Sequence, residues 1–242
     1  MKVDILAIGV HPDDVELGCG GTLLAQKQQG SSTAIVDLTQ GELGTRGTPA
    51  LRLQEAEAAG KILGVEKRIN LKMADGFFAN DRANQLKLIA AIRFFQPDII
   101  LGNAKYDRHP DHGRAAKLIY DACFLSGLAK IETEWEGEQQ GKWRPRMLLN
   151  YIQDRYMKPE IVVDISDYYE QKLAAVQAFS SQFFDPNYDP NSEEEPTYIS
   201  SPVFLDNLAS RAMELGRPMG FTYGEGFTSY RLLGTKNLNS II

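Results

Sequence analysis

The regular alternation of short apolar segments with helix-like segments is the feature that most constrains the fold of this chain. Four apolar runs have the length and composition of strands that are buried on both faces of a sheet. They lie at residues 5–10, 33–38, 68–71 and 98–102. The three intervening segments have helical patterns that end at a glycine or just before a proline, at residues 16–29, 48–63 and 81–95. This alternation with short turns predicts a parallel sheet with right-handed crossovers.

The second half of the chain is less regular. A helix is predicted at residues 114–125, and strands are predicted at residues 147–152 and 160–165. Asp167 and Glu170 are expected to form a capping box for a helix that runs to about residue 183.

Residues 185–196 are polar, with proline and asparagine at turn positions, and are expected to form a long loop. Such loops often act as lids or binding loops, and a solvated loop without a role is the alternative. Tyr198 follows this loop, and its role stays open. No repeat or linker interrupts the sequence. We therefore expect one domain over residues 1–242, with a Rossmann-like, mostly parallel sheet flanked by helices and an elaborated C-terminal half.

The charge and cysteine content exclude several classes of function. The chain has 26 basic and 32 acidic residues, a formal net charge of −6, and no run of lysine or arginine. It therefore lacks the cationic surface on which nucleic acids and anionic membranes dock. Its two cysteines lie far apart and fit a reducing compartment, and no signal-peptide pattern or membrane-length apolar run is present. We expect a cytoplasmic protein.

All three histidines of the chain fall in two short, similar motifs. The first motif, residues 11–14, reads His-Pro-Asp-Asp and follows the first predicted strand; the second, residues 109–112, reads His-Pro-Asp-His and follows the fourth. In a doubly wound sheet of strand order 3-2-1-4, the first and fourth strands are neighbours, and ligands bind at their carboxyl ends. The sequence therefore predicts that the two motifs meet in one crevice.

These motifs offer more groups than a catalytic zinc ion needs. Such an ion takes three protein ligands and keeps one position open, and mixed histidine and carboxylate sets are common. The candidates are His11, Asp13, Asp14, His109 and His112. The surplus suits an acid, a base and an orienting group. Zinc is the default metal for this set, and ferrous iron suits it too. The alternative for the two adjacent aspartates is that they cap the following helix.

The two motifs resemble those of the LmbE / PIG-L metal-dependent deacetylases, and the resemblance extends over most of the chain. It implies that His11, Asp14 and His112 bind zinc. It also implies that Asp13 is the general base, and that His109 is an imidazolium that stabilises the oxyanion or protonates the leaving amine. We further expect Asp111 to orient His109.

Several loops are similar to those of the bacillithiol-biosynthesis branch of that family. They are residues 44–47, Arg52 with Glu55, residues 75–78 and residues 223–227. The resemblance to this branch implies N-acetylglucosaminyl-malate as the substrate and removal of its acetyl group as the reaction.

Malate carries two carboxylates, which arginine side chains bind well. Arg46, Arg52 and Arg108 fall near the carboxyl ends of predicted strands and are candidate substrate contacts, with Arg52 the first choice. The alternative for Arg52 is an ion pair with Glu55, three residues further along the same helix.

Gly18, Gly20 and Gly21 do not fit a dinucleotide-binding motif, and close helix packing explains them better. Cys19 is expected to be a small buried apolar residue.

Other functions stay open at this point. The chain is expected to act on a small molecule and to form a homo-oligomer. Another N-acetylglucosamine compound or a chitooligosaccharide is the alternative substrate. A metallophosphoesterase is a second class, although two-metal sites need more ligands than these motifs offer. A noncatalytic sugar- or nucleotide-binding module is a third, because a fold does not determine a function.

Overall fold

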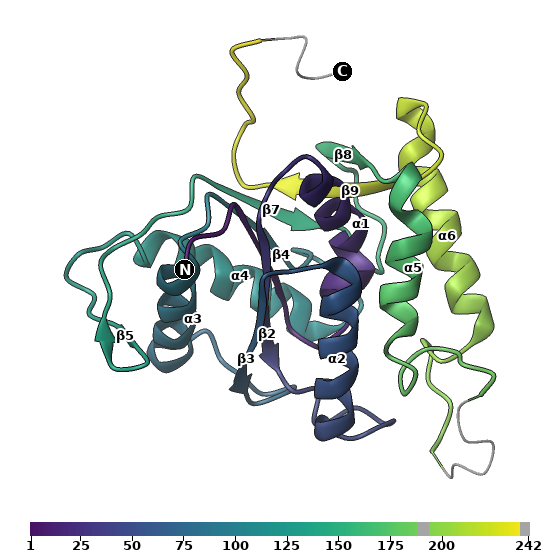
Figure 1. The fold of residues 1–242 in the computed structure, drawn as a ribbon, viewed down its shortest axis with the longest axis horizontal. Coiled ribbons are helices and arrows are strands. Elements are labelled where there is room, and N and C mark those ends of the chain that lie inside the picture. The colour runs from purple at the N-terminus through teal and green to yellow at the C-terminus, as the bar shows by residue number, and fades with distance from the viewer. Residues whose placement is uncertain (188–193, 238–242) are drawn as a thin grey trace.

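In the computed structural model, which describes residues 1–187 and 194–237, a seven-stranded sheet is flanked by helices on both faces (Figure 1). Its strands are β1 (Ile5–Gly9), β2 (Thr33–Thr39), β3 (Lys67–Met73), β4 (Ile99–Gly102), β7 (Met147–Tyr151), β8 (Ile161–Asp164) and β9 (Gly224–Ser229). The helices are α1 (Asp14–Gln28), α2 (Pro49–Leu63), α3 (Arg82–Phe95), α4 (Pro110–Leu125), α5 (Tyr169–Gln177) and α6 (Pro202–Gly216). Short 3-10 turns lie at Ser166–Tyr168 and Arg217–Met219, and β5 (Glu134–Trp135) pairs with β6 (Glu138–Gln139) apart from the main sheet.

The strand order is β3-β2-β1-β4-β7-β9-β8. The first four strands are parallel in the predicted order 3-2-1-4, and β7 extends the parallel set. Strand β9 then runs antiparallel between β7 and β8. The predicted α/β fold with a mostly parallel sheet is confirmed. The sequence patterns did not predict β9 or α6, which belong to the elaborated C-terminal half.

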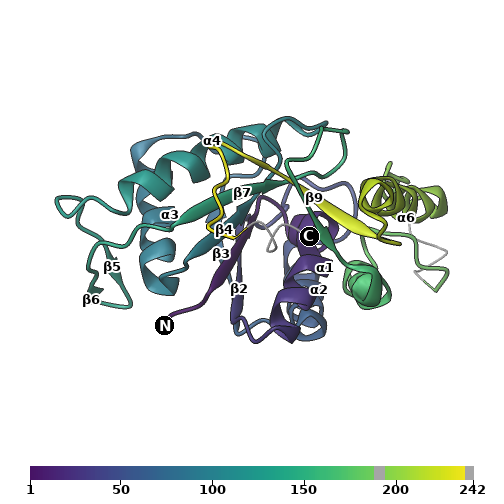
Figure 2. The same cartoon turned by 90° about the horizontal axis from the view of Figure 1, so that it is seen from above.

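Two layers of helices cover the sheet (Figure 2). Helices α3 and α4 lie on one face, and α1, α2 and α5 lie on the other. Alternate residues of β1 point to opposite faces, as strand geometry requires. Leu6 and Ile8 pack against α3 and α4, whereas Ile5 and Ala7 pack against α1. Helix α6 packs outside this second layer, where Phe204 joins a cluster with Phe179.

Helix boundaries differ from the predicted ones at two places. Helix α4 begins at Pro110, not at residue 114, so the second histidine motif forms its N-terminus. Proline is favoured at the first helical position because it has no N–H to leave unpaired. The predicted capping box of Asp167 and Glu170 is wrong. Residues 166–168 form a 3-10 turn instead, and α5 begins without a side-chain cap and ends at Gln177.

Helix α1 is broken at Cys19, whose φ of −150° is not helical. The break exposes backbone groups that a continuous helix would pair. The carboxylate of Glu225, on β9, accepts hydrogen bonds from the amides of Gly21 and Thr22, at 3.0 and 2.7 Å. Lys172, on α5, donates to the carbonyl of Leu17 at 2.9 Å and pairs with Glu225 at 2.5 Å. The two side chains of this buried ion pair therefore form hydrogen bonds with backbone groups on both sides of the break.

The glycines of α1 allow close packing, as the sequence predicted. A Cβ at Gly18 would overlap the ring of Tyr151, and a Cβ at Gly21 would lie 2.9 Å from Ile165. The buried Tyr151 hydroxyl donates to the carbonyl of Ile8 at 3.0 Å, so a shift of this ring would break that hydrogen bond. Cys19 is fully buried, in line with the prediction of a small apolar residue.

Gly18→Ala is expected to destabilise the fold by about 1–3 kcal/mol, because an extra methyl group overpacks a core that cannot relax. The free energy of unfolding from urea titration measures this effect. Gly141→Ala is the matched control, since a Cβ there meets nothing within 4 Å. Equal stability of the two variants would contradict the packing explanation.

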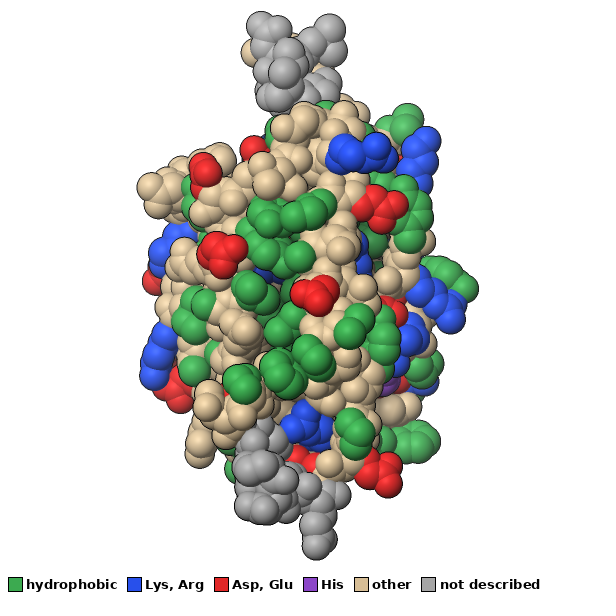
Figure 3. All heavy atoms as spheres, turned by 90° about the vertical axis from the view of Figure 1, so that its right-hand side faces the viewer, with side chains coloured by type: hydrophobic (Ala, Val, Ile, Leu, Met, Phe, Trp, Pro, Cys, Tyr) green, Lys and Arg blue, Asp and Glu red, His purple; other side chains and the backbone are tan. Residues whose placement is uncertain are grey.

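Hydrophobic side chains gather on the face of the molecule that α6 forms (Figure 3). Val203 and Met213 of this helix are 59% and 47% exposed. Among the helices of residues 1–187 and 194–237, none has the length and apolar character needed to cross a bilayer.

Candidate metal centre

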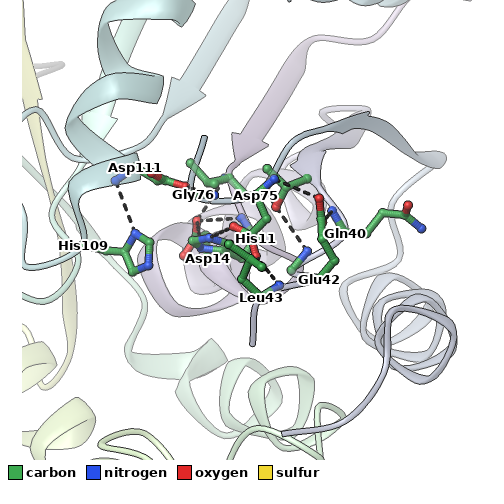
Figure 4. Close-up of polar contacts among 12 residues, drawn as sticks. His11, Asp14, Gln40, Glu42, Leu43, Asp75, Gly76, His109 and Asp111 are labelled. Carbon is green, nitrogen blue, oxygen red and sulfur yellow. Dashed lines mark hydrogen bonds and ion pairs between the residues drawn. The ribbon is translucent and has the colours of Figure 1, made fainter. Parts of the chain in front are cut away.

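The two histidine motifs meet at the carboxyl end of β1, as predicted from the strand order. The ring centroids of His11 and His109 are 4.7 Å apart, those of His109 and His112 are 5.2 Å apart, and those of His11 and His112 are 5.7 Å apart. Each of the three rings offers a nitrogen within 4.8 Å of the other two. Figure 4 shows His11, Asp14 and His109 around this point, with Asp75 and Asp111 beside them.

Asp14 is the most firmly held carboxylate of the centre. It is buried, and four N–H groups donate to its oxygens. They are the amides of Val10 and His11 and the side chains of Asn103 and Gln153, at 2.6–3.1 Å. Burial alone would raise the pKa of Asp14, but His112 and these hydrogen bonds hold it well below its usual range. Asp14 is therefore an ionised ligand candidate that does not cap α1.

His112 has one ring nitrogen fixed and the other without a hydrogen bond. Its Nδ1 lies 2.5 Å from Asp107, whose other oxygen accepts the amide of Arg155 at 2.8 Å. Among the described residues, no group forms a hydrogen bond with the buried Nε2, which faces Asp14 Oδ1 at 3.2 Å. Burial alone would lower the pKa of His112, but Asp14 and Asp107 raise it to about 10. The two carboxylates therefore make this point attractive to a cation.

His11 is oriented by a residue that the motif analysis did not single out. Its Nε2 lies 3.0 Å from Asp75 Oδ1, and its Nδ1 faces Asp14 Oδ2 at 3.7 Å. The other oxygen of Asp75 accepts the amide of Leu43 at 3.0 Å. Burial opposes ionisation, but the hydrogen bonds from His11 and Leu43 lower the pKa of Asp75 to about 2. The sequence pointed to Asp75 only through a loop resemblance.

His109 caps helix α4 with its side chain. Its Nδ1 accepts the amide N–H of Asp111 at 3.3 Å, so in this arrangement the proton lies on Nε2. Burial lowers the pKa of His109, and the neighbouring His11 and His112 lower it further. These conditions favour a neutral imidazole that donates through Nε2.

Asp111 differs from its expected role. Its carboxylate accepts the amide of Gly76 at 2.8 Å and pairs with Arg114 at 2.6 Å. The backbone of Asp111, not its carboxylate, contacts His109. Asp111 therefore holds the turn that begins at Asp75, and it is Asp75 that contacts His11.

The ion pair of Arg52 with Glu55, the alternative to a substrate contact, is not what the structure shows. Arg52 is buried and donates to Asp13 Oδ2 at 2.7 Å. Glu55 accepts hydrogen bonds from the amide and hydroxyl of Ser181 instead, at 2.7 and 2.8 Å. Burial raises the pKa of Asp13 to about 7, and Arg52 limits this rise.

The other two candidate arginines also have acidic partners. Arg46 lies 3.8 Å from Glu194, at the end of the long loop, of which residues 188–193 lie outside the described part. Arg108 lies 3.3 Å from Asp154 and stacks on the ring of Tyr198, with its guanidinium 4.8 Å from the ring centre. Arg108 is half exposed and lies next to His109 in the chain. Tyr198 thus belongs to the surroundings of Arg108.

The donor set fits a divalent transition metal. Two ligands of a tetrahedral zinc ion with bonds of 2.0–2.1 Å lie about 3.3 Å apart. The gaps of 3.2 Å between His112 and Asp14 and 3.7 Å between His11 and Asp14 are close to this value. Nε2 of His112 and the carboxylate of Asp14 could serve as ligand atoms, and Asp107 and Asp75 contact the other nitrogens of the two rings, as carboxylates commonly do at metal sites.

Sequence reasoning missed most of these supporting residues. Asp107, Asn103 and Gln153 contact the centre only because the sheet brings their loops to it. Asp107 and Asn103 follow β4, so their position in the sequence could have placed them at the carboxyl edge of the sheet, beside the histidines. Gln153 follows β7, whose position beside β4 the sequence did not predict.

The chain is similar to a protein family and to a solved structure. The model of the PIG-L family, described as GlcNAc-PI de-N-acetylase, matches residues 6–123. The crystal structure of a conserved protein from Thermus thermophilus is 36% identical, with a TM-score of 0.83, and the alignment covers 97% of this chain and 98% of that one.

Two curated relatives have names that state an activity. A diacetylchitobiose deacetylase from Thermococcus kodakarensis is 29% identical over 92% of this chain and 81% of its own length. A probable N-acetyl-alpha-D-glucosaminyl L-malate deacetylase from Bacillus anthracis is 26% identical over 74% of this chain and 81% of its own length.

Proposed function

The chain belongs to the PIG-L family, and we propose that it is a metal-dependent N-deacetylase that hydrolyses the acetamido group of a small N-acetylglucosamine conjugate. One observation carries this proposal. His11, Asp14 and His112 converge at the end of β1, with Asp13 and His109 beside them. This set combines metal ligands with a base and a proton donor, which amide hydrolysis requires because an amide is a poor electrophile with a poor leaving group.

His11, Asp14 and His112 are the proposed ligands. The buried Nε2 of His112, which faces Asp14 and forms no hydrogen bond within the described part of the chain, supports this assignment. Bound there, a zinc ion supplies Lewis acidity toward the amide carbonyl and toward water. Ferrous iron suits the same donors.

Asp13 is the proposed general base, which takes a proton from the attacking water. A base whose pKa lies near the working pH combines the correct ionisation state with useful basicity, and burial moves Asp13 in that direction. His109 is proposed to donate a hydrogen bond from Nε2 to the carbonyl oxygen, and the proton that Asp13 takes from the water is proposed to pass to the leaving nitrogen. The lowered pKa of His109 favours a neutral hydrogen-bond donor over the imidazolium that the family resemblance implied.

Chelation is expected to abolish activity and leave the fold intact, because the hydrophobic core forms without the ion. His112→Ala is expected to lower the bound metal far below the wild-type value of about one ion per chain. Metal analysis and far-UV circular dichroism measure both effects. Full turnover by verified metal-free protein would refute the metal assignment, and two ions per chain would favour a metallophosphoesterase.

Two substrates are candidates. N-acetylglucosaminyl-malate follows from the loop resemblance, and the half-exposed Arg108 beside His109 is the arginine best presented to a carboxylate. Diacetylchitobiose is the second, because the relative of that activity aligns over more of the chain. All three arginines have an acidic partner, but the side chains of Arg46 and Arg52 are only 12% and 6% exposed, which weakens the case that either binds malate.

The deciding experiment is acetate release from both compounds, measured as kcat/KM. Arg108→Ala should raise KM for the malate conjugate and not for diacetylchitobiose if Arg108 binds the malate. Release from neither compound would overturn the proposed function.

We also propose that the chain forms a homo-oligomer in the cytoplasm. The exposed apolar residues of α6 support self-association, and the two free cysteines suit a reducing compartment. Light scattering on the purified protein tests the oligomer.

A further inference from the structure

Asp13 has a strained backbone. Its φ is 139°, a region that residues with a side chain rarely adopt. It occupies the N-cap position of α1 but makes no side-chain cap hydrogen bond. A conformation of this kind costs on the order of 1–3 kcal/mol and persists only where surrounding groups enforce it. Something other than helix capping therefore holds this residue.

Arg52 makes the contacts that hold it. Its Nη2 donates to Asp13 Oδ2 at 2.7 Å and approaches the carbonyl of Pro12 at 3.3 Å. One nitrogen thus binds both the backbone and the side chain of the strained turn. Both side chains are only 6% exposed, so water does not weaken the ion pair. The hydrogen bond and the ion pair from Arg52 both reach the same oxygen, Asp13 Oδ2.

The glycine-rich loop is shaped around this guanidinium. Gly41 has a φ of +65°, and a Cβ there would overlap Nη1 of Arg52. A Cβ at Gly44 would lie 3.4 Å from the same nitrogen. Thr48 caps α2 by accepting the amide of Leu51, which fixes the turn that carries Arg52. The guanidinium is therefore enclosed by its own loop and is not presented to a ligand.

We propose that Arg52 is a positioning residue. It holds Asp13 Oδ2 in the strained turn and leaves Oδ1 free to accept the proton of the attacking water. This inference rests on the proposed function, in which Asp13 is the general base. It differs from the role in substrate binding that the sequence suggested for Arg52, and the two roles act on different kinetic constants.

Arg52→Gln tests the inference. Misplacement of a catalytic group by about 1 Å costs on the order of 10²-fold in rate, so kcat should fall by about that factor. KM and metal content should stay near the wild-type values. In an Asp13→Asn background, Arg52→Gln should reduce kcat little further, because the carboxylate that Arg52 positions is already absent. If Arg52→Gln does not fold, Arg52→Lys is the test variant. Its kcat should also fall, but by a smaller factor, because lysine restores one charged contact with Asp13.

Two further variants sharpen the test. Gly41→Ala should also lower kcat, since its Cβ displaces the guanidinium. Lys61→Ala, on the exposed face of the same helix, should leave both constants unchanged. A rise in KM with unchanged kcat in Arg52→Gln would overturn the inference and restore substrate binding. Independent, additive losses in the double variant would also overturn it. A wild-type protein that releases no acetate would instead overturn the proposed function itself.

Discussion

Asp13→Asn is expected to reduce turnover by about 10²–10⁴-fold, the range that general-base catalysis supplies. Asparagine keeps the size of the side chain and an oxygen that can accept from Arg52, so the change removes basicity and little else. Bound metal should stay near the wild-type amount, because the proposed ligands are His11, Asp14 and His112.

The measurement pairs kcat on the better of the two sugar substrates with metal analysis of the same preparation. Asp81→Asn is the control, since asparagine caps a helix as well as aspartate does and Asp81 is an exposed residue that caps α3. Loss of metal from Asp13→Asn would show that the two adjacent aspartates have been assigned the wrong way round.

Arg68→Met is expected to destabilise the protein by about 3–5 kcal/mol, the usual cost of leaving buried charges without a partner. Arg68 lies between Glu16 and Asp37, at 2.5 and 2.7 Å, and both carboxylates are buried. For a domain of this size, the melting temperature should fall by roughly 6–20 °C. Arg82→Met, at an exposed position, should change it little.

The loss in Arg68→Met should depend on pH with a definite sign. Burial raises the pKa of Glu16 in the native protein, and Arg68 opposes that rise. Without Arg68 the folded-state pKa lies further above that of the unfolded chain, so protonation favours the fold. This contribution is present at low pH and is lost as the pH rises through the folded-state pKa. The deficit should therefore be smaller at about pH 5 than at about pH 8. A deficit independent of pH would mean that lost packing dominates.

The first half of the fold could be read from the sequence because local signals agree there. Parallel strands covered on both faces are continuous apolar runs, as Ile99–Gly102 illustrates. Thr48 with Pro49, and Asp81, mark helix starts that the structure contains. Strand β9 gave no such signal, since its sequence GEGFTS is short and polar, and only pairing with β7 and β8 makes it a strand.

The candidate site divides in the same way. The motifs and the strand order predicted which histidines meet, because topology alone decides that. The partners of each ring could not be predicted. Asp111 binds the turn at Gly76, and Asp107 binds His112, although each aspartate lies within a few residues of both His109 and His112. The direction in which each side chain points decides such contacts, and its distance along the sequence does not. That direction depends on the residue at which helix α4 begins.

The ion pair at the break of α1 also restricts how this chain can diverge. Lys172 and Glu225 lie 53 residues apart and share one buried site. A lineage that loses the lysine alone passes through a protein with an uncompensated interior carboxylate, at a cost of about 3–5 kcal/mol. That is a large part of the stability of an ordinary domain. Descendants of this sequence should therefore keep the two residues together, or replace both along with a helix that no longer breaks.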